Sequence, residues 1–445
     1  MNRRDFLKLT GAAVGGIVMG SCGGNGGGAG GGAPMPIGYR FFRIAGPGAP
    51  LPDGTRVAKV GEGSMMNRSA DVIMFADNSS GRGGMYQFAM DYSGAQPAIG
   101  AGRKVVAQGD AIDGFEVGHI GYGSSNRAGH NVCVLKMTSG LNGVYADRDG
   151  AGMHPVLMPT GAIGGTDDPN LTFHGYWGDV DMDDAGNILA KAVVHTQAQP
   201  LCREALVHVA AATGNKTVVA EEGAELPGGD EKIGAFGLLD LAGSNGHYAV
   251  QVFGSGQGAG LQGNSGGAAG SSGMLRGNVS EHFLRAKTLA ASASASLKKS
   301  QRTAVLIGNV QYGPRIGADA RVAQVIHRAA DFPVLTFDGN DVISKGMVTP
   351  LGNTVTSMGA PIVAESGLVY VVLESENRTA ELCIYNGSIL RTVLASGDPV
   401  VSSGGDVPIR AFAFGVLRDM MDDAGRLVMT GAFDDGLHVV VGIPY

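Results

Sequence analysis

The sequence MDDAGNILAKAVV occupies residues 182–194, and a close copy, MDDAGRLVMTGAF, occupies residues 421–433. Each copy predicts a tight turn that leads into a β-strand. The first aspartate can accept hydrogen bonds from the amides of the turn, and the glycine can adopt a positive φ without a Cβ clash. The apolar alternation that follows suits a half-buried strand. The structural turn residues of the two copies are Asp183, Gly186, Asp422 and Gly425.

The same four-residue turn can be aligned at seven places along the chain. The candidates lie at 67–70, 126–129, 183–186, 243–246, 317–320, 364–367 and 422–425. Successive copies are 57 to 60 residues apart, except for spacings of 74 and then 47 on either side of the fifth. We interpret this exception as a long insertion in the fourth unit, at the Gly/Ser tract 254–273, followed by a shortened or misregistered fifth unit.

A second landmark has the same period. An apolar pair followed by a turn glycine recurs at Val105–Gly109, Val218–Gly223 and Val393–Gly397. Between the two landmarks each unit has room for about four strands. This predicts an all-β fold, a β-propeller of about seven four-stranded blades. The last unit lacks one strand, and Tyr39–Gly46 has the missing pattern, so we expect the N-terminal strand to close the last blade.

The composition agrees with a sheet protein that has many short connections. Glycine accounts for 75 of 445 residues, and only 16% of the residues are charged. The net charge of −7 provides no basic field, so nucleic-acid binding is not expected. Cys133 and Cys383 lie in apolar strand patterns, which predicts buried thiols. A disulfide that involves Cys202, or metal or catalytic use of a cysteine, remains an alternative.

The N-terminal residues 1–22 are interpreted as a targeting segment. Arg3 and Arg4 precede Phe-Leu-Lys, which resembles the twin-arginine export signal. The segment ends at Met19–Cys22, which resembles a bacterial lipobox and implies lipidation of Cys22. An ordinary secretory leader with an incidental cysteine is the alternative.

These resemblances divide the chain into the signal 1–22, a glycine-rich tether at 23–36 and the repeat domain at 37–445. They imply export by the twin-arginine translocase. The protein is then expected on the periplasmic or cell-surface side, attached to a membrane by an N-terminal lipid.

The repeated pattern of asparagine or aspartate, two residues, glycine, two residues and an apolar pair resembles the NxxGxxAF tandem-repeat family. The resemblance covers about 37–445 and is closest at the turns 183–186 and 422–425. Members are bacterial exported or surface proteins. The family implies repeats and export, and it assigns no catalytic residue.

One cluster of residues could carry chemistry, and it consists of His174, Trp177, Asp179 and Asp181. These side chains could line a ligand pocket at the mouth of a propeller, or they could be scattered loop residues. By the period of a strand, Asp179, Asp181 and Asp183 share one face and could hold Ca²⁺. Alternatively, Asp183 makes the turn and the other two are solvated. No confident metal site is predicted, because the ten histidines lack metal-binding spacings, and any cofactor is unknown.

The leading functional hypothesis is a binding or interaction module for an unknown protein or glycan ligand. The alternatives are a propeller hydrolase or lyase that acts on an extracellular polysaccharide, and a cofactor-carrying redox protein. An enzyme predicts carboxylates or histidines from three or more blades that meet at one axial mouth. A binding module predicts an exposed aromatic or apolar patch.

Overall fold

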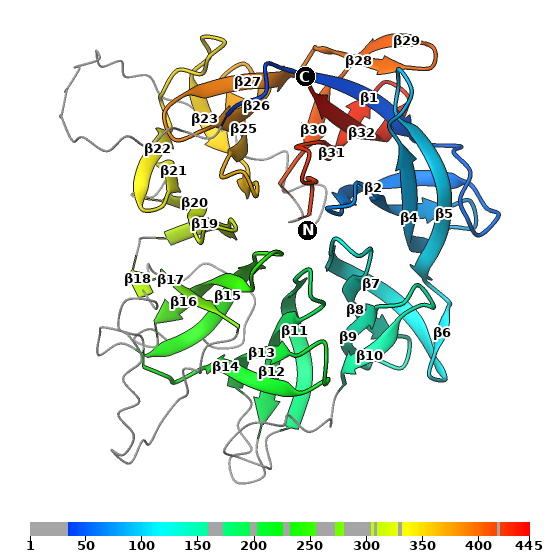
Figure 1. Ribbon diagram of the computed structural model, residues 1–445, viewed down its shortest axis with the longest axis vertical. Helices are drawn as coiled ribbons and strands as arrows, with labels where there is room; N and C mark the ends of the chain where they lie inside the picture. The colour runs from blue at the N-terminus through cyan, green and yellow to red at the C-terminus, as the bar shows by residue number, and fades with distance from the viewer. Residues whose placement is uncertain are drawn as a thin grey trace. The chain divides into compact units, whose positions relative to one another are not determined.

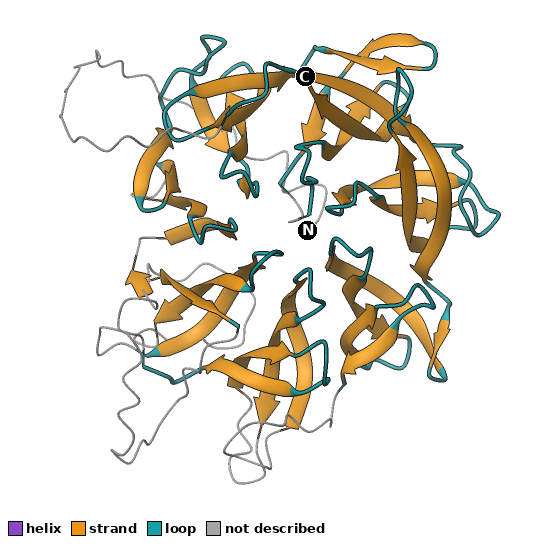
Figure 2. Ribbon diagram, in the orientation of Figure 1, coloured by secondary structure: helices purple, strands orange, loops and turns teal. Residues whose placement is uncertain are grey.

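The computed structural model describes residues 34–158, 172–195, 203–225, 232–254, 272–279, 304–306, 309–327, 332–415 and 419–445. The predicted signal with Arg3, Arg4 and Cys22, and the tether up to Ala33, lie outside the described residues, as does Cys202. The residues Ala33–Tyr445 form one compact unit. Its described parts consist of strands, turns and connections (Figure 2).

The strands form seven sheets that follow one another along the chain (Figure 1). The first sheet contains β2 (Val57–Met66), β3 (Val72–Asn78), β4 (Gly83–Asp91) and β5 (Ala98–Ala107). The second contains β6 (Ala111–Ile112), β7 (Phe115–Ser125), β8 (Asn131–Met137), β9 (Asn142–Asp147) and β10 (His154–Leu157). The third contains β11 (Thr172–Met182), β12 (Ile188–His195), β13 (Arg203–Val209) and β14 (Lys216–Glu221).

The remaining sheets repeat this pattern. The fourth contains β15 (Ile233–Leu241), β16 (His247–Gly254), β17 (Ser272–Asn278) and β18 (Ala304–Leu306). The fifth contains β19 (Asn309–Ile316), β20 (Val322–His327), β21 (Pro333–Phe337) and β22 (Asn340–Ser344). The sixth contains β23 (Val355–Met358), β24 (Ile362–Val363), β25 (Val369–Ser375), β26 (Ala380–Tyr385) and β27 (Leu390–Ala395). The seventh contains β1 (Tyr39–Ala45), β28 (Pro399–Ser402), β29 (Gly405–Pro408), β30 (Ala411–Ala413), β31 (Leu427–Phe433) and β32 (Gly436–Pro444).

The sheets are the blades of a seven-bladed β-propeller. Around the ring β7 contacts β2, β11 contacts β7, β15 contacts β11, β19 contacts β15 and β24 contacts β19. The strand β2 also contacts β31 and β32 of the last blade. The sixth blade meets the last where the hydroxyls of Tyr370 and Tyr39 lie 3.0 Å apart. The predicted fold class is therefore confirmed.

The ring is closed by the N-terminal strand, as predicted. The strand β1 pairs antiparallel with β32, with Arg43 opposite Val440, and its outer edge pairs in parallel with β28 at Phe42 and Val401. Sealing the last blade in this way pairs backbone groups that would otherwise remain at an open edge. Residues from both ends of the described body share one buried core, which includes Phe41 and Val440.

All seven predicted turns join the innermost strand of a blade to its neighbour. The fourth residue of each turn has a positive φ, and two of these residues are alanines, Ala70 at 71° and Ala320 at 61°. The fourth turn is one residue longer than predicted, because the N–H of Gly246 donates to the carbonyl of Ala242 rather than to that of Gly243. The fifth turn has the predicted position, and its blade has all four strands. The Gly/Ser tract predicted as an insertion falls mostly outside the described residues, between β16 and β17.

Buried side chains fill the spaces between neighbouring blades. The free thiols of Cys133 and Cys383 lie in this core, as predicted. Burial raises the pKa of the Cys133 thiol, and it raises that of Cys383 to about 12, so neither is a ready nucleophile. In the parts of the chain that the structure covers, no helix has the length and apolar character needed to cross a membrane.

Candidate functional site

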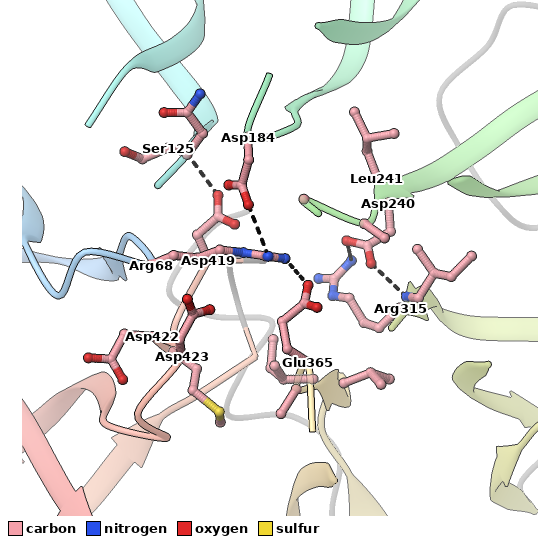
Figure 3. A pocket seen from close by; sticks show the side chains of 18 of the residues that line it. Arg68, Ser125, Asp184, Asp240, Leu241, Arg315, Glu365, Asp419, Asp422 and Asp423 are labelled. Carbon is pink, nitrogen blue, oxygen red and sulfur yellow. Dashed lines mark hydrogen bonds and ion pairs between the residues drawn. The ribbon is translucent and has the colours of Figure 1, made fainter. Parts of the chain in front are cut away.

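Six of the seven turns and the end of β19 surround a hollow of about 70 Å³ at the propeller axis (Figure 3). Every blade contributes at least one residue to its lining, from Arg68 of the first blade to Asp423 of the last. The hollow exists because each turn holds its tip toward the axis, with the N–H of its fourth residue bonded back to a carbonyl at the start of the turn. The predicted repeat therefore builds the candidate site directly.

The second residue of each turn determines the charge at this axial mouth. These residues are Arg68, Arg127, Asp184, Ser244, Ala318, Glu365 and Asp423. Arg68 extends across the hollow, donates to Asp184 at 3.1 Å and also pairs with Glu365 (Figure 3). One guanidinium thus joins turns of the first, third and sixth blades.

A second arginine extends this network. Arg127 pairs with Asp423, and its Nε lies 3.8 Å from the Asp184 carboxylate. The hydroxyl of Ser244 donates to Glu365 at 3.1 Å. Six of the seven second positions are therefore connected across the axis, by two arginines, three carboxylates and one hydroxyl. We call this set the axial network.

Below the axial network, buried aspartates join neighbouring blades. An innermost strand has one unpaired edge, so its N–H groups need acceptors from elsewhere. Asp181 accepts from Leu241 N–H at 2.8 Å, and Asp240 accepts from Ile316 N–H at 2.7 Å. Asp181 and Asp240 occupy the same position in adjacent blades, one residue before the end of the innermost strand. These carboxylates join the third blade to the fourth and the fourth blade to the fifth.

The acidic residues predicted as a candidate site belong to this layer. Asp179 accepts from Leu239 N–H at 3.2 Å, so Asp179 and Asp181 both extend from β11 toward β15. Asp181 is only 2% exposed, and the alternative in which it is solvated is wrong. Neither residue lines the axial hollow. The side chains of His174 and Trp177 lie outside the described residues, so their role in a ligand site stays a prediction.

Each predicted turn aspartate accepts a hydrogen bond from the backbone N–H four residues later in the chain. Asp183 accepts from the N–H of Asn187 at 2.8 Å, and Asp422 accepts from the N–H of Arg426 at 2.8 Å. Burial raises the pKa of both carboxyls above the ordinary aspartate value, although these hydrogen bonds oppose the rise. Within the described ranges, no group of three or more His, Cys, Asp or Glu residues is arranged to hold a metal ion.

Sequence reasoning missed Arg68, Arg127 and Glu365, although a signal for them was present. When the seven turns are aligned, their second column contains two arginines and three acidic residues. Neighbouring residues in that column come from different blades and face one axis. Opposite charges at the same aligned turn position of a closed ring of repeats therefore indicate contacts across the ring.

Comparisons with known proteins find distant structural similarity. No family model and no curated protein matches the sequence. Similar solved structures include the Dos1 propeller, with 8% identity over 91% of this chain and 95% of that chain and a TM-score of 0.41. A Penicillium chrysogenum α-L-arabinanase complexed with arabinobiose has 11% identity, coverages of 92% and 98% and a TM-score of 0.38. A Trypanosoma rangeli sialidase in complex with sialic acid has 8% identity, coverages of 92% and 59% and a TM-score of 0.39.

Similarity this low carries no argument about function. The assignment as a propeller stands on the strand pairing of this chain, and the resemblance to the NxxGxxAF family stays a prediction.

Proposed function

We propose that the protein is an exported, lipid-anchored propeller that binds a ligand with a positively charged group at its axial mouth. The observation that carries the proposal is the position of Arg68, a cation of the protein itself held between Asp184 and Glu365 in the hollow. A ligand amine or guanidinium can take the place of this side chain. Six of the residues that line the hollow are acidic and two are basic, which favours a cation over an anion.

The exchange keeps Asp184 and Glu365 paired with a cation. The ion pairs of Arg68 are partly exposed, and the Arg68 side chain itself is 17% exposed. Breaking such mostly buried pairs is costly when a charge is left without a partner, but a ligand cation in the place of Arg68 leaves neither carboxylate unpaired. Arg68 can therefore leave the carboxylates when another cation replaces it, while the buried aspartates below keep the ring intact.

A matched pair of glycans tests this proposal. Chitosan oligosaccharides carry amines, and their fully acetylated counterparts have the same backbone without the charge. We expect the purified protein to bind the amino glycan, to bind the acetylated one at least tenfold more weakly, and to lose the difference at high salt. Isothermal titration calorimetry measures both affinities. Equal affinities for the two glycans would refute a cation site.

Three variants connect binding to the axial network. Asp184→Asn combined with Glu365→Gln should abolish binding, whereas Arg68→Met should strengthen it because the competing cation is gone. Asp319→Asn is the control, since Asp319 is an exposed turn residue that pairs with Arg321 outside the network. Weaker binding by Arg68→Met would show that the arginine contacts the ligand rather than competing with it.

The second candidate is a hydrolase or lyase that acts on a polysaccharide. It is favoured by the carboxylates of Asp184, Glu365 and Asp423, which come from three blades and border one hollow. Their oxygens contact arginines in this structure, and for that reason we rank binding first. Release of reducing or unsaturated sugar ends from extracellular polysaccharides, lost in Asp184→Asn, would establish the enzyme instead.

The export part of the proposal is supported by the sequence of residues 1–33. Replacing Arg3 and Arg4 by lysines should keep the protein in the cytoplasm, and Cys22→Ala should release it from membranes. Cell fractionation with an antibody against the propeller measures both results. Normal export of the first variant, or unchanged membrane retention of the second, would refute the respective step.

A further inference from the structure

Three highly exposed apolar side chains lie together where the N-terminal segment joins the propeller. Ile37 is 81% exposed, Tyr445 69% and Ile389 57%, and no other large apolar residue in the described ranges exceeds 57%. In Figure 1 this place is at the outer edge of the ring, next to β1 and β27. The axial hollow is a separate site, since none of these three residues lines it.

Hydrogen bonds fix these residues in place. The N–H of Ile37 donates to the carbonyl of Tyr445 at 2.9 Å, and the N–H of Tyr445 donates to Gly38 at 3.1 Å. Arg391, two residues after Ile389, donates to the carbonyls of Pro36 at 2.8 Å and Ile37 at 3.2 Å. These hydrogen bonds give the segment a defined position on the surface, with the Ile37 side chain exposed to solvent.

Arg40 follows Ile37 by three residues and Arg391 follows Ile389 by two, and both arginines are exposed. We call these five residues, Ile37, Arg40, Ile389, Arg391 and Tyr445, the rim patch. Isoleucine side chains enter the hydrocarbon boundary of a bilayer, tyrosine prefers the interface, and arginine binds anionic headgroups. This composition fits a lipid surface.

The length of the chain before the rim patch indicates that the surface which contacts the patch is the membrane. Fourteen residues separate Cys22 from Ile37, so a lipid on Cys22 holds the bilayer within about 50 Å of the patch. Tethering over such a distance raises the effective concentration of the bilayer at the patch to about the millimolar range. A weak contact is then enough to keep the patch on the membrane, and a free protein partner has no such advantage.

We infer that the rim patch rests on the surface of the membrane that carries the lipid anchor, with Ile37 and Ile389 inserted among anionic lipid headgroups. The inference rests on the proposed anchor at Cys22. Contact through the outer edge orients the propeller edge-on and leaves the axial mouth open to ligands from the periplasmic or extracellular side.

Hydrogen–deuterium exchange of the full lipidated protein tests the contact. In vesicles of phosphatidylethanolamine and phosphatidylglycerol, we expect slower exchange at 37–40 and 386–391 than in detergent micelles. Ile37→Ser combined with Ile389→Ser should remove the protection. Val348→Ser combined with Leu351→Ser is the matched control, because these residues are 57% and 56% exposed but lie in the hairpin between β22 and β23. That control should keep the protection.

A second measurement separates failure of the patch from failure of the anchor. If wild type sediments with vesicles and Cys22→Ala does not, yet wild type shows no protection at the rim patch, the inference is overturned and the anchor stands. If wild type itself does not sediment, both are overturned. Protection that survives the double isoleucine variant also overturns the inference. Protection lost in that variant and kept in the control supports it.

Discussion

The inter-blade aspartates make a prediction whose size follows from the structure. Asp181→Ala removes both acceptors of a buried carboxylate, leaving Leu241 N–H and Met182 N–H, each at 2.8 Å, without a partner. Each lost hydrogen bond to a charged group costs about 1.5–3 kcal/mol. The alanine also avoids the desolvation of the carboxylate, so we expect a loss of about 3 kcal/mol in the free energy of unfolding. Asp181→Asn keeps one acceptor and should lose about 1.5 kcal/mol.

Equilibrium unfolding in urea, followed by circular dichroism, measures these losses. The control is Asp319→Asn, which breaks an exposed ion pair with Arg321 and should change stability by about 1 kcal/mol or less. Hydrogen exchange at 239–241 should accelerate in Asp181→Ala, because the seam between β11 and β15 opens.

Two results would refute this reasoning. If Asp181→Ala unfolds at the wild-type urea concentration, the carboxylate does not hold the two blades together. If Ca²⁺ raises the unfolding midpoint of wild type and Asp181→Ala abolishes that rise, Asp181 is a metal ligand, and the structural role assigned to it is incomplete. We expect EDTA and Ca²⁺ to leave the midpoint unchanged.

Three further predictions concern the turns and the closing strand. Tyr39→Phe removes the hydroxyl that joins β1 to Tyr370 of the sixth blade and to the turn carbonyl of Gly425, and it should cost about 1–2 kcal/mol in urea unfolding. An unchanged midpoint would contradict that role. At the fourth turn position, Ala70→Gly should stabilise the protein by about 0.5–1 kcal/mol and Gly186→Ala should destabilise it by a similar amount, because both positions have a positive φ. Effects of the opposite sign would show that the positive φ does not strain a side chain at these positions. The raised pKa of Asp183 contributes stability that is present below the ordinary aspartate pKa of about 4 and is lost as pH rises through the folded pKa. Asp183→Asn should therefore flatten the decline of stability above pH 4, as measured by urea midpoints across pH. A steeper decline in the variant than in wild type would contradict this reasoning.

Much of the fold could be predicted from local sequence because its signals are local. A turn with positive φ at its fourth residue needs glycine or tolerates alanine there, and the alternating strand after it needs apolar residues on one face. Repeating both signals seven times leaves few architectures, and the missing last strand pointed to Tyr39–Gly46. The extra residue in the fourth turn was missed because Ala242 has no side-chain feature that marks the start of a turn.

The candidate site was predicted less well, and the reason is the distance between its parts along the chain. Arg68 is 116 residues from Asp184 and 297 residues from Glu365 along the chain, and nothing in the local sequence indicates that these side chains are in contact. The run Asp179, Asp181, Asp183 looked like a ligand set because carboxylates at alternate positions suggest a cation. The structure gives Asp179 and Asp181 backbone amides of the next blade as partners, and such partners exist only once β15 lies beside β11.

The sequence by itself determined the repeat unit, an approximate number of about seven units and the strand that closes the ring, since each depends on contacts within a unit or between adjacent units. The tertiary structure decided which charges face one another across the axis and which aspartates are buried between blades. Ring closure sets the angle at which each turn points inward, and that angle is a property of all seven blades together. Only then does a single guanidinium lie between carboxylates from two distant blades.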